Sequence, residues 1–346
     1  MSLIGKIDSG GFEQVILPRC GAYRENVVGG PAFGVDVSVV ELPGKLGLAM
    51  TSDPLSLIPS LGLQESAWLS VHLMANDMAT TGFAPMYAQM VLNLPPTLTA
   101  DDFETYWNHI HQYCKQIGVA ITGGHTGSIE GQNSTIAGGG TMLLTAPLNN
   151  IRLSRNAQPG NVIIVTKQCA MSSAAILAMS FPETVKHKLG AEIYRQGCEL
   201  FYQTSSLTDG LIAAAGVEVT AMHDVTEGGV LGAIYEMAVA SGTGVRIINE
   251  LLPVGHTQQA ICSLFNIDYR FCIGAGSMVI ATTREGSDAV LQRLHAENID
   301  AAVVGEFTRP ELGYQLVEND IAYPMPYYSK DPYWDAFFNA YKNGWN

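Results

Sequence analysis

The chain has 346 residues, of which 47% are hydrophobic and 14% are charged, and its formal net charge at pH 7 is −14. This composition supports a large buried core and excludes intrinsic disorder, and the length suits two domains of ordinary size. The acidic balance argues against nucleic acid as a partner, and no apolar run reaches the roughly 18 residues of a membrane span.

The first half of the chain predicts one α/β domain, from residue 1 to about residue 150. Alternating apolar residues predict two strands between 35 and 53, joined by a turn at Pro43-Gly44-Lys45. Helical spacing of apolar residues predicts amphipathic helices at 64–81 and 101–117, with Thr99 or Asp101 as the cap of the second. A strand lies between these helices, and two more strands follow the second one.

The register of the first hairpin brings two carboxylates together. A turn centred on Gly44 makes paired residue numbers add to about 88. Asp36 then lies opposite Ser52 and beside Asp53, at the open end of the hairpin.

The second half predicts another α/β domain, at 155–315, after a polar linker that contains Pro159-Gly160. A buried strand opens it, and helical stretches are expected at 172–180 and 189–216. A strand then enters an acidic loop at Asp224, and a helix follows this loop. The aromatic tail at 316–346 is interpreted as a helix docked on the body, or as an oligomer contact.

The six cysteines are dispersed and form no CxxC pair, which argues against a cysteine zinc site. We expect reduced thiols and therefore a cytoplasmic protein. The first thirty residues also lack the apolar block of a signal peptide. The cysteines are Cys20, Cys114, Cys169, Cys198, Cys262 and Cys272.

The candidate chemistry rests on acidic residues, because the common phosphate-binding glycine loops and hydrolase motifs are absent. Carboxylates at element ends suit Mg²⁺, which would let an acidic protein bind a polyphosphate. Each position also has an ordinary interpretation: a turn former, a helix cap for Asp224, or a solvated face for Asp77. The four candidates are Asp36, Asp53, Asp77 and Asp224.

A glycine pair at Gly123-Gly124 precedes His125 and Thr126, after a predicted strand. The segment reads either as a tight turn or as backbone N–H groups that face an anion. His125 is open to three interpretations: a ligand, a base or an ordinary polar loop residue.

Several segments, in this order, resemble the aminoimidazole ribonucleotide (AIR) synthase superfamily, also called PurM-like. They include FGVDVSVV, AMTSDPL and GVAITGGHT, and the most specific are ANDMATTGFAPMYAQMVLNLP and MHDVTEGGVLGAIYEMAVASGTGVRI. The likeness spans about residues 5–310, and the overall pattern is nearest to the hydrogenase-maturation dehydratase branch.

The resemblance implies a two-domain PurM-like fold, with an N-terminal mixed sheet that pairs across a homodimer and a C-terminal α/β domain. It implies ATP bound with Mg²⁺ through Asp36, Asp53 and Asp77. In most members ATP activates an oxygen of a small metabolite for displacement. The other implied site residues are Gly123, Gly124, Thr126, Asn76 and Glu227 for the nucleotide, and Asp224 and His125 for catalysis.

This sequence departs from the family pattern at three places. Val35-Asp36 stands where many members have Asp-Asp, and His125 stands where several have a carboxylate, although imidazole suits Mg²⁺ poorly. No cysteine follows Cys272, so dehydration of a substrate carried on the chain's own terminal cysteine is not expected. Cys20 lacks the glycine context of the selenophosphate synthetase nucleophile, and a buried or bystander thiol is the favoured interpretation.

Three functions remain open at this point. The first is an ATP-dependent enzyme of this superfamily that acts on an unidentified small molecule. The second is an ATP-binding maturation or scaffold protein that turns over little and binds a protein partner. The third is phosphoribosylformylglycinamidine cyclo-ligase, the AIR synthase itself.

Overall fold

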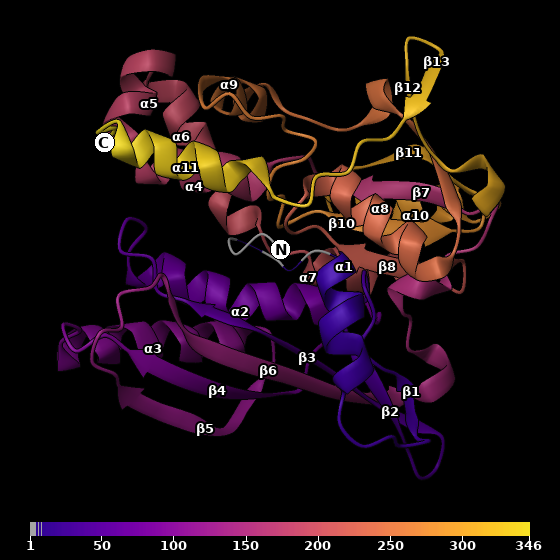
Figure 1. The fold of residues 1–346 in the computed structure, drawn as a ribbon, viewed down its shortest axis with the longest axis horizontal. Coiled ribbons are helices and arrows are strands. Elements are labelled where there is room, and N and C mark those ends of the chain that lie inside the picture. Colours follow the sequence, from indigo (N-terminus) through magenta and orange to yellow (C-terminus); the bar gives the residue numbers. More distant parts are fainter. Residues whose placement is uncertain (1–4, 6, 8) are drawn as a thin grey trace.

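Two β-sheets organise the protein in a computed structural model, which describes residues 5, 7 and 9–346 (Figure 1). The first sheet has six strands in the order β1-β2-β3-β6-β4-β5. Its strands are β1 (Val27–Gly29), β2 (Ser38–Leu42), β3 (Leu46–Ser56), β4 (Tyr87–Leu94), β5 (Ala120–Ser128) and β6 (Ile136–Pro147).

The predicted register of the β2–β3 hairpin is confirmed, since Ser38 pairs with Met50 and Leu42 with Leu46. The ladder stops at Ser38, because β2 begins there and not at residue 35. Asp36 therefore lies beyond the paired residues and is free to turn toward the second half of the chain.

Two helices cover one face of this sheet: α2 (Leu63–Ala79) and α3 (Ala100–Gln116). Thr99 caps α3, and its side chain accepts a hydrogen bond of 3.1 Å from the Asp102 backbone N–H. Along β4 burial alternates, so that Met90 is buried whereas Tyr87 and Val91 are exposed. The other face of the sheet is therefore uncovered in the single chain.

The second sheet has seven strands in the order β13-β12-β9-β11-β7-β10-β8, and only the β9–β12 pair is parallel. Both the mixed sheets and the two-part α/β organisation agree with the predicted fold class. The strands are β7 (Val162–Thr166), β8 (Val219–Asp224), β9 (Gly244–Ile248), β10 (Met278–Thr282), β11 (Ala301–Thr308), β12 (Tyr314–Glu318) and β13 (Ile321–Pro324).

Helices lie where they were expected at Met171–Ser180 and, after Asp224, at Gly229–Ser241, but the continuous helix expected at 189–216 is wrong. It is broken into α6 and α7, with a short 3-10 turn at Phe201–Gln203 between them. The Thr204 carbonyl and the Ser206 N–H form hydrogen bonds with the Asn76 side chain of α2. These backbone groups are therefore not used in the hydrogen bonds of a continuous helix. The helices are α4 (Met171–Ser180), α5 (Pro182–Leu189), α6 (Ala191–Glu199), α7 (Leu207–Ala213), α8 (Gly229–Ser241), α9 (His256–Leu264), α10 (Ser287–Ala296) and α11 (Pro332–Lys342).

Helix α2 joins the two halves. It lies between the first sheet and the second half, where it contacts α7 and β8 (Figure 1). One apolar core runs across this junction and includes Met74 and Met78 of α2 with Met222 and Met278 of the second sheet. Because apolar packing is continuous there, the acidic end of α2 is held against the end of β8.

The C-terminal tail, 316–346, begins within β12, contains all of β13 and closes with α11, which packs on the second half (Figure 1). Tyr333 and Ala340 of α11 are buried against Ile261 of α9 and Leu177 of α4. The expected docked helix is confirmed for this part of the tail. Among the residues that the structure describes, no helix is both long enough and apolar enough to cross a membrane.

Candidate functional site

Four carboxylates from both halves gather at the junction beside α2. Asp77 is on α2, and burial raises the pKa of its carboxyl well above the usual range. The negative charges of Asp224, Asp53 and Asp36 raise this pKa further. Thr51 of β3 opposes the shift by donating a hydrogen bond of 2.6 Å to Asp77 Oδ2.

Asp36 reaches this cluster by turning away from the hairpin. Its Oδ2 accepts hydrogen bonds from Ser154 Oγ at 3.1 Å and from His223 Nδ1 at 2.6 Å. Single ligand atoms of Asp36, His223 and Asp224 all lie within 4.8 Å of one another. The two halves of the chain thus supply neighbouring groups to one site.

His223 bridges two buried carboxylates. Its Nδ1 contacts Asp36, and its Nε2 lies 3.4 Å from Glu236 Oε2 of α8. Burial lowers the pKa of the imidazole, but Asp36 and Glu236 outweigh this and raise it to about 10. Because both imidazole nitrogens contact carboxylates, the carboxylate oxygens are the donors here that suit a hard cation.

His223, Glu236, Thr51 and Ser154 were not among the residues selected from the sequence. One signal was present: Glu236 is the only carboxylate in α8, an otherwise apolar helix that is almost fully buried. A carboxylate in such a position requires a partner, and His223 supplies it.

The donor set fits Mg²⁺. All four aspartates offer hard oxygen ligands, which this ion prefers over nitrogen or sulfur. Burial and the negative charges of its neighbours raise the pKa of Asp77, and a divalent cation would relieve the repulsion among these carboxylates.

The glycine segment lies elsewhere in the single chain. Gly123, Gly124, His125 and Thr126 are within β5, at the edge of the first sheet. The tight-turn interpretation is therefore wrong, because the strand continues through both glycines. Gly124 has φ +147°, and a Cβ there would lie 1.8 Å from the Met90 carbonyl oxygen, so only glycine fits.

His125 does not join the acidic cluster of its own chain. It pairs with Val91 of β4 and is exposed, on the face of the sheet that α2 does not cover. Asp53 pairs with Gly140 of β6 and is separated from β5 by two strands. A shared site for His125 and the acids would therefore need a second copy of the chain.

The last two predicted site residues contact protein groups. Asn76 donates to the Thr204 carbonyl at 3.0 Å and accepts from the Ser206 N–H at 2.7 Å, so its amide ties α2 to the second half. Glu227 follows β8 and accepts a hydrogen bond of 3.2 Å from Trp334 Nε1 of α11. Both therefore connect elements of the fold next to the acidic cluster.

Comparison with known proteins gives consistent matches over most of the chain. Residues 34–143 match the N-terminal domain of AIR synthase related proteins, and residues 158–315 match the C-terminal domain. Carbamoyl dehydratase HypE from Rhizobium leguminosarum bv. viciae is 27% identical over 79% of this chain and 76% of its own length.

Solved structures match in fold as well. The crystal structure of Escherichia coli HypE has a TM-score of 0.70 at 22% identity, covering 82% of this chain and 87% of that one. A structure of hydrogenase maturation protein HypE in complex with ATP has a TM-score of 0.69 at 18% identity, covering 96% and 95%. With both domain models matched in order, the chain belongs to the AIR synthase related proteins, near their HypE branch.

Proposed function

We propose that this protein is an ATP- and Mg²⁺-dependent enzyme that activates or phosphorylates an oxygen of a small metabolite. The observation that carries the proposal is the convergence of four carboxylates from both halves at one buried junction, with the pKa of Asp77 raised. The family membership and the ATP complex of a HypE relative support the nucleotide.

In this proposal Asp36, Asp53 and Asp77 hold the cation. Asp36 keeps its orientation through Ser154 and His223, whose positive charge also limits the repulsion within the cluster. Asp224 closes the site from the second half and faces the reacting end of the nucleotide. Mg²⁺–ATP would supply the phosphoryl group, and the chain would mainly position the groups and neutralise charge.

In this proposal the glycine-containing strand β5 contributes to the site of a second copy of the chain in a homodimer. Gly123, Gly124, Thr126 and His125 would then serve a site that includes the partner's first sheet, because in one chain they lie apart from the acids. Asn76 and Glu227 would support the nucleotide site by holding α2 and the loop after β8 in place.

A screen of small metabolites for ADP release tests the function. We expect one class, such as a carbamoyl, amide or phosphate-bearing compound, to stimulate Mg²⁺-dependent ADP release from the wild type and not from Asp77→Asn. Formylglycinamidine ribonucleotide belongs in the screen because it tests the cyclo-ligase directly. Equal ADP release by the wild type and Asp77→Asn would contradict the proposal.

An ATP-binding maturation or scaffold protein is the second candidate. It is favoured by the position of His125, which is remote from the acidic cluster of its own chain. In this case ATP would bind with Mg²⁺, but no metabolite would stimulate ADP release, and a protein partner would purify with the chain.

A further inference from the structure

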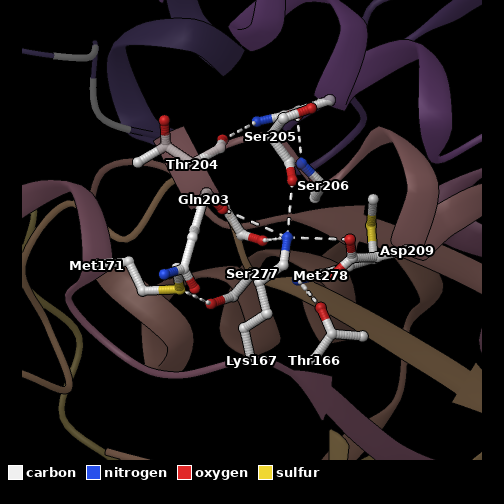
Figure 2. Close-up of polar contacts among 12 residues, drawn as sticks. Thr166, Lys167, Met171, Gln203, Thr204, Ser205, Ser206, Asp209, Ser277 and Met278 are labelled. Atoms are coloured by element: carbon white, nitrogen blue, oxygen red, sulfur yellow. Dashed lines mark hydrogen bonds and ion pairs between the residues drawn. The ribbon is translucent and has the colours of Figure 1, made fainter. Parts of the chain in front are cut away.

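A lysine ammonium is held by four oxygens where the two halves of the chain meet. Lys167 follows β7, and dashed lines converge on its Nζ in Figure 2. Nζ lies 2.7 Å from the Ser205 carbonyl oxygen, 3.0 Å from that of Gly276 and 3.3 Å from that of Gln203. The fourth oxygen is Asp209 Oδ2 of α7, at 3.0 Å.

The number of oxygens exceeds the number of hydrogen bonds that an ammonium can donate, because Lys has three N–H donors and four oxygens surround it. The distances of 2.7–3.3 Å are also too long for a small divalent ion, since Mg²⁺ takes oxygen at roughly 2.0–2.1 Å and Ca²⁺ at about 2.3–2.6 Å. Carbonyl oxygens arranged around a larger monovalent ion are the way proteins replace the hydration shell of K⁺.

The charge of the site requires a cation. The Asp209 side chain is 2% exposed, and that of Lys167 is 17% exposed. Asp209 Oδ1 has no hydrogen-bond partner among the residues that the structure describes, so the lysine is the carboxylate's counter-ion. Removal of the lysine alone would leave a buried charge without compensation, which is strongly destabilising.

The segment that surrounds the ammonium is also bound by α2. Besides the two bonds to Asn76, Trp68 Nε1 donates to Thr204 Oγ1 at 3.0 Å, and His72 Nδ1 lies 3.0 Å from Ser205 Oγ. Residues 203–206 are therefore held between α2 on one side and Lys167 on the other. This is the segment that interrupts the helix expected at 189–216.

The Gly276 carbonyl connects the ammonium to β8. Gly276 precedes Ser277, whose Oγ donates to the Gln168 carbonyl at 2.7 Å and whose carbonyl accepts from the Val225 N–H at 3.2 Å. Met278, the next residue, pairs with Asp224. Lys167 thus lies between the segment that holds α2 and the segment that holds the end of β8.

We propose that Lys167 fills a monovalent-cation site with the chain's own ammonium, and that this tethered cation fixes α2 and β8 relative to one another. A free ion of the K⁺ or NH₄⁺ class would occupy the same four oxygens when the lysine side chain is removed. The wild type consequently needs no monovalent ion at this place.

Thermal unfolding of Lys167→Ala tests this site without reference to ATP. The melting temperature (Tm) is measured in choline, Na⁺, NH₄⁺ and K⁺ chloride at equal ionic strength. We expect the wild-type Tm to be equal in choline and K⁺. We expect the variant Tm to fall by several degrees in choline, and NH₄⁺ or K⁺ to restore at least half of the loss. The double variant Lys167→Ala with Asp209→Asn is the matched control and should show no restoration, because its site lacks the charge.

Lys167→Gly provides a second variant in case Lys167→Ala does not fold. Lys167 has φ +52°, a conformation that glycine adopts without strain, so this variant keeps the backbone and vacates the site. A variant Tm equal to wild type in choline would overturn the proposal. So would a deficit of the same size in all four salts, or failure of both variants to fold in every salt.

A second readout concerns the position of α2 and β8 and rests on the proposed function. In Lys167→Ala, Mg²⁺–ATP affinity should fall in choline and recover in K⁺ in parallel with the Tm. If neither the wild type nor Lys167→Ala binds ATP, but K⁺ still restores the Tm of the variant, the cation site stands and the proposed nucleotide site alone is refuted.

Discussion

At the scale of single residues, the candidate site is a balance of buried charges. Four aspartates repel one another, and the His223 imidazolium compensates two buried carboxylates, Asp36 and Glu236. Because each charge is buried, the free energy of keeping it in the folded protein depends mainly on whether an opposite charge lies beside it. Substitutions here should therefore change stability through the partner that they leave behind.

His223→Gln should destabilise the protein by about 3–5 kcal/mol near pH 7, because it leaves two buried carboxylates without their cation. Chemical denaturation would measure this loss. His111→Gln, at an exposed position of α3, is the matched control and should stay within about 0.5 kcal/mol of wild type. A loss no larger than that of the control would show that the bridge between Asp36 and Glu236 does not stabilise the fold.

At the scale of elements, two carboxylates fix α11 to the loop after β8: Glu227 of that loop and Asp331 at the start of the helix. Asp331 is buried and accepts hydrogen bonds from the Gly228 N–H at 2.7 Å and the Tyr333 N–H at 2.8 Å. Burial raises the pKa of this carboxyl to about 7, although both hydrogen bonds oppose the shift. The tail is therefore coupled to the backbone next to Asp224 through a group that titrates near neutrality.

The raised pKa of Asp331 predicts a pH dependence of stability with a defined sign. The folded state keeps the proton up to about pH 7, whereas the unfolded carboxyl loses it near 3.8, so this group's contribution to stability falls as pH rises from about 4 to 7. Asp331→Asn does not titrate, and wild type should lose stability relative to it by up to about 1.4 kcal/mol per pH unit in that window.

Denaturation curves at pH 5, 6, 7 and 8 measure this difference. Asp335→Asn, on the exposed side of the same helix, controls for the loss of an acidic residue from α11. If the stability profiles of wild type and Asp331→Asn run parallel from pH 5 to pH 7, the titration does not contribute.

Elements whose form depends on residues nearby in the sequence could be predicted. Elements whose form depends on contacts with residues far away in the sequence could not. The β2–β3 register follows from the turn at Gly44, and the extents of α2 and α3 follow from apolar spacing and the Thr99 cap. The break between α6 and α7 could not be predicted, because Asn76 and Lys167 impose it from remote parts of the chain.

The candidate site shows the same division. Acidic residues at element ends could be selected locally, and in the structure the charges of Asp36, Asp53 and Asp224 all act on Asp77. The role of His223 could not be recognised from the sequence, because its contacts with Asp36 and Glu236 depend on how the two halves pack. His125 was selected for its motif, but the position of β5 at the sheet edge separates it from the acids.

At the scale of the whole molecule, the uncovered face of the first sheet is the candidate surface for a homodimer. It exposes Tyr87 and Val91 of β4 at 44% and 43%, and His125 lies beside Val91. Apolar side chains on one open sheet face are typical of an interaction surface. Pairing of two such faces would place His125 at the interface between copies.

In the proposed homodimer, Val91→Lys should separate the two copies, because it places a charge on the apolar face that would be buried between them. Light scattering coupled to size exclusion measures the mass in solution. Val217→Lys is the control, since Val217 is 96% exposed at a loop of the second half. A wild-type protein that is monomeric at high concentration, or a Val91→Lys protein that stays dimeric, would refute this surface.

The central claim is that Asp36, Asp53 and Asp77 bind a nucleotide through Mg²⁺. Isothermal titration of ATP into the protein, with Mg²⁺ and with EDTA, tests it most directly. We expect binding with Mg²⁺ and at least a tenfold weaker affinity in EDTA, which corresponds to about 1.4 kcal/mol. Asp77→Asn should show the same loss with Mg²⁺ present while remaining folded, because the amide has the shape of the carboxyl and can still accept the hydrogen bond from Thr51. Binding of ATP with equal affinity in Mg²⁺ and EDTA, or by Asp77→Asn as by wild type, would contradict the account.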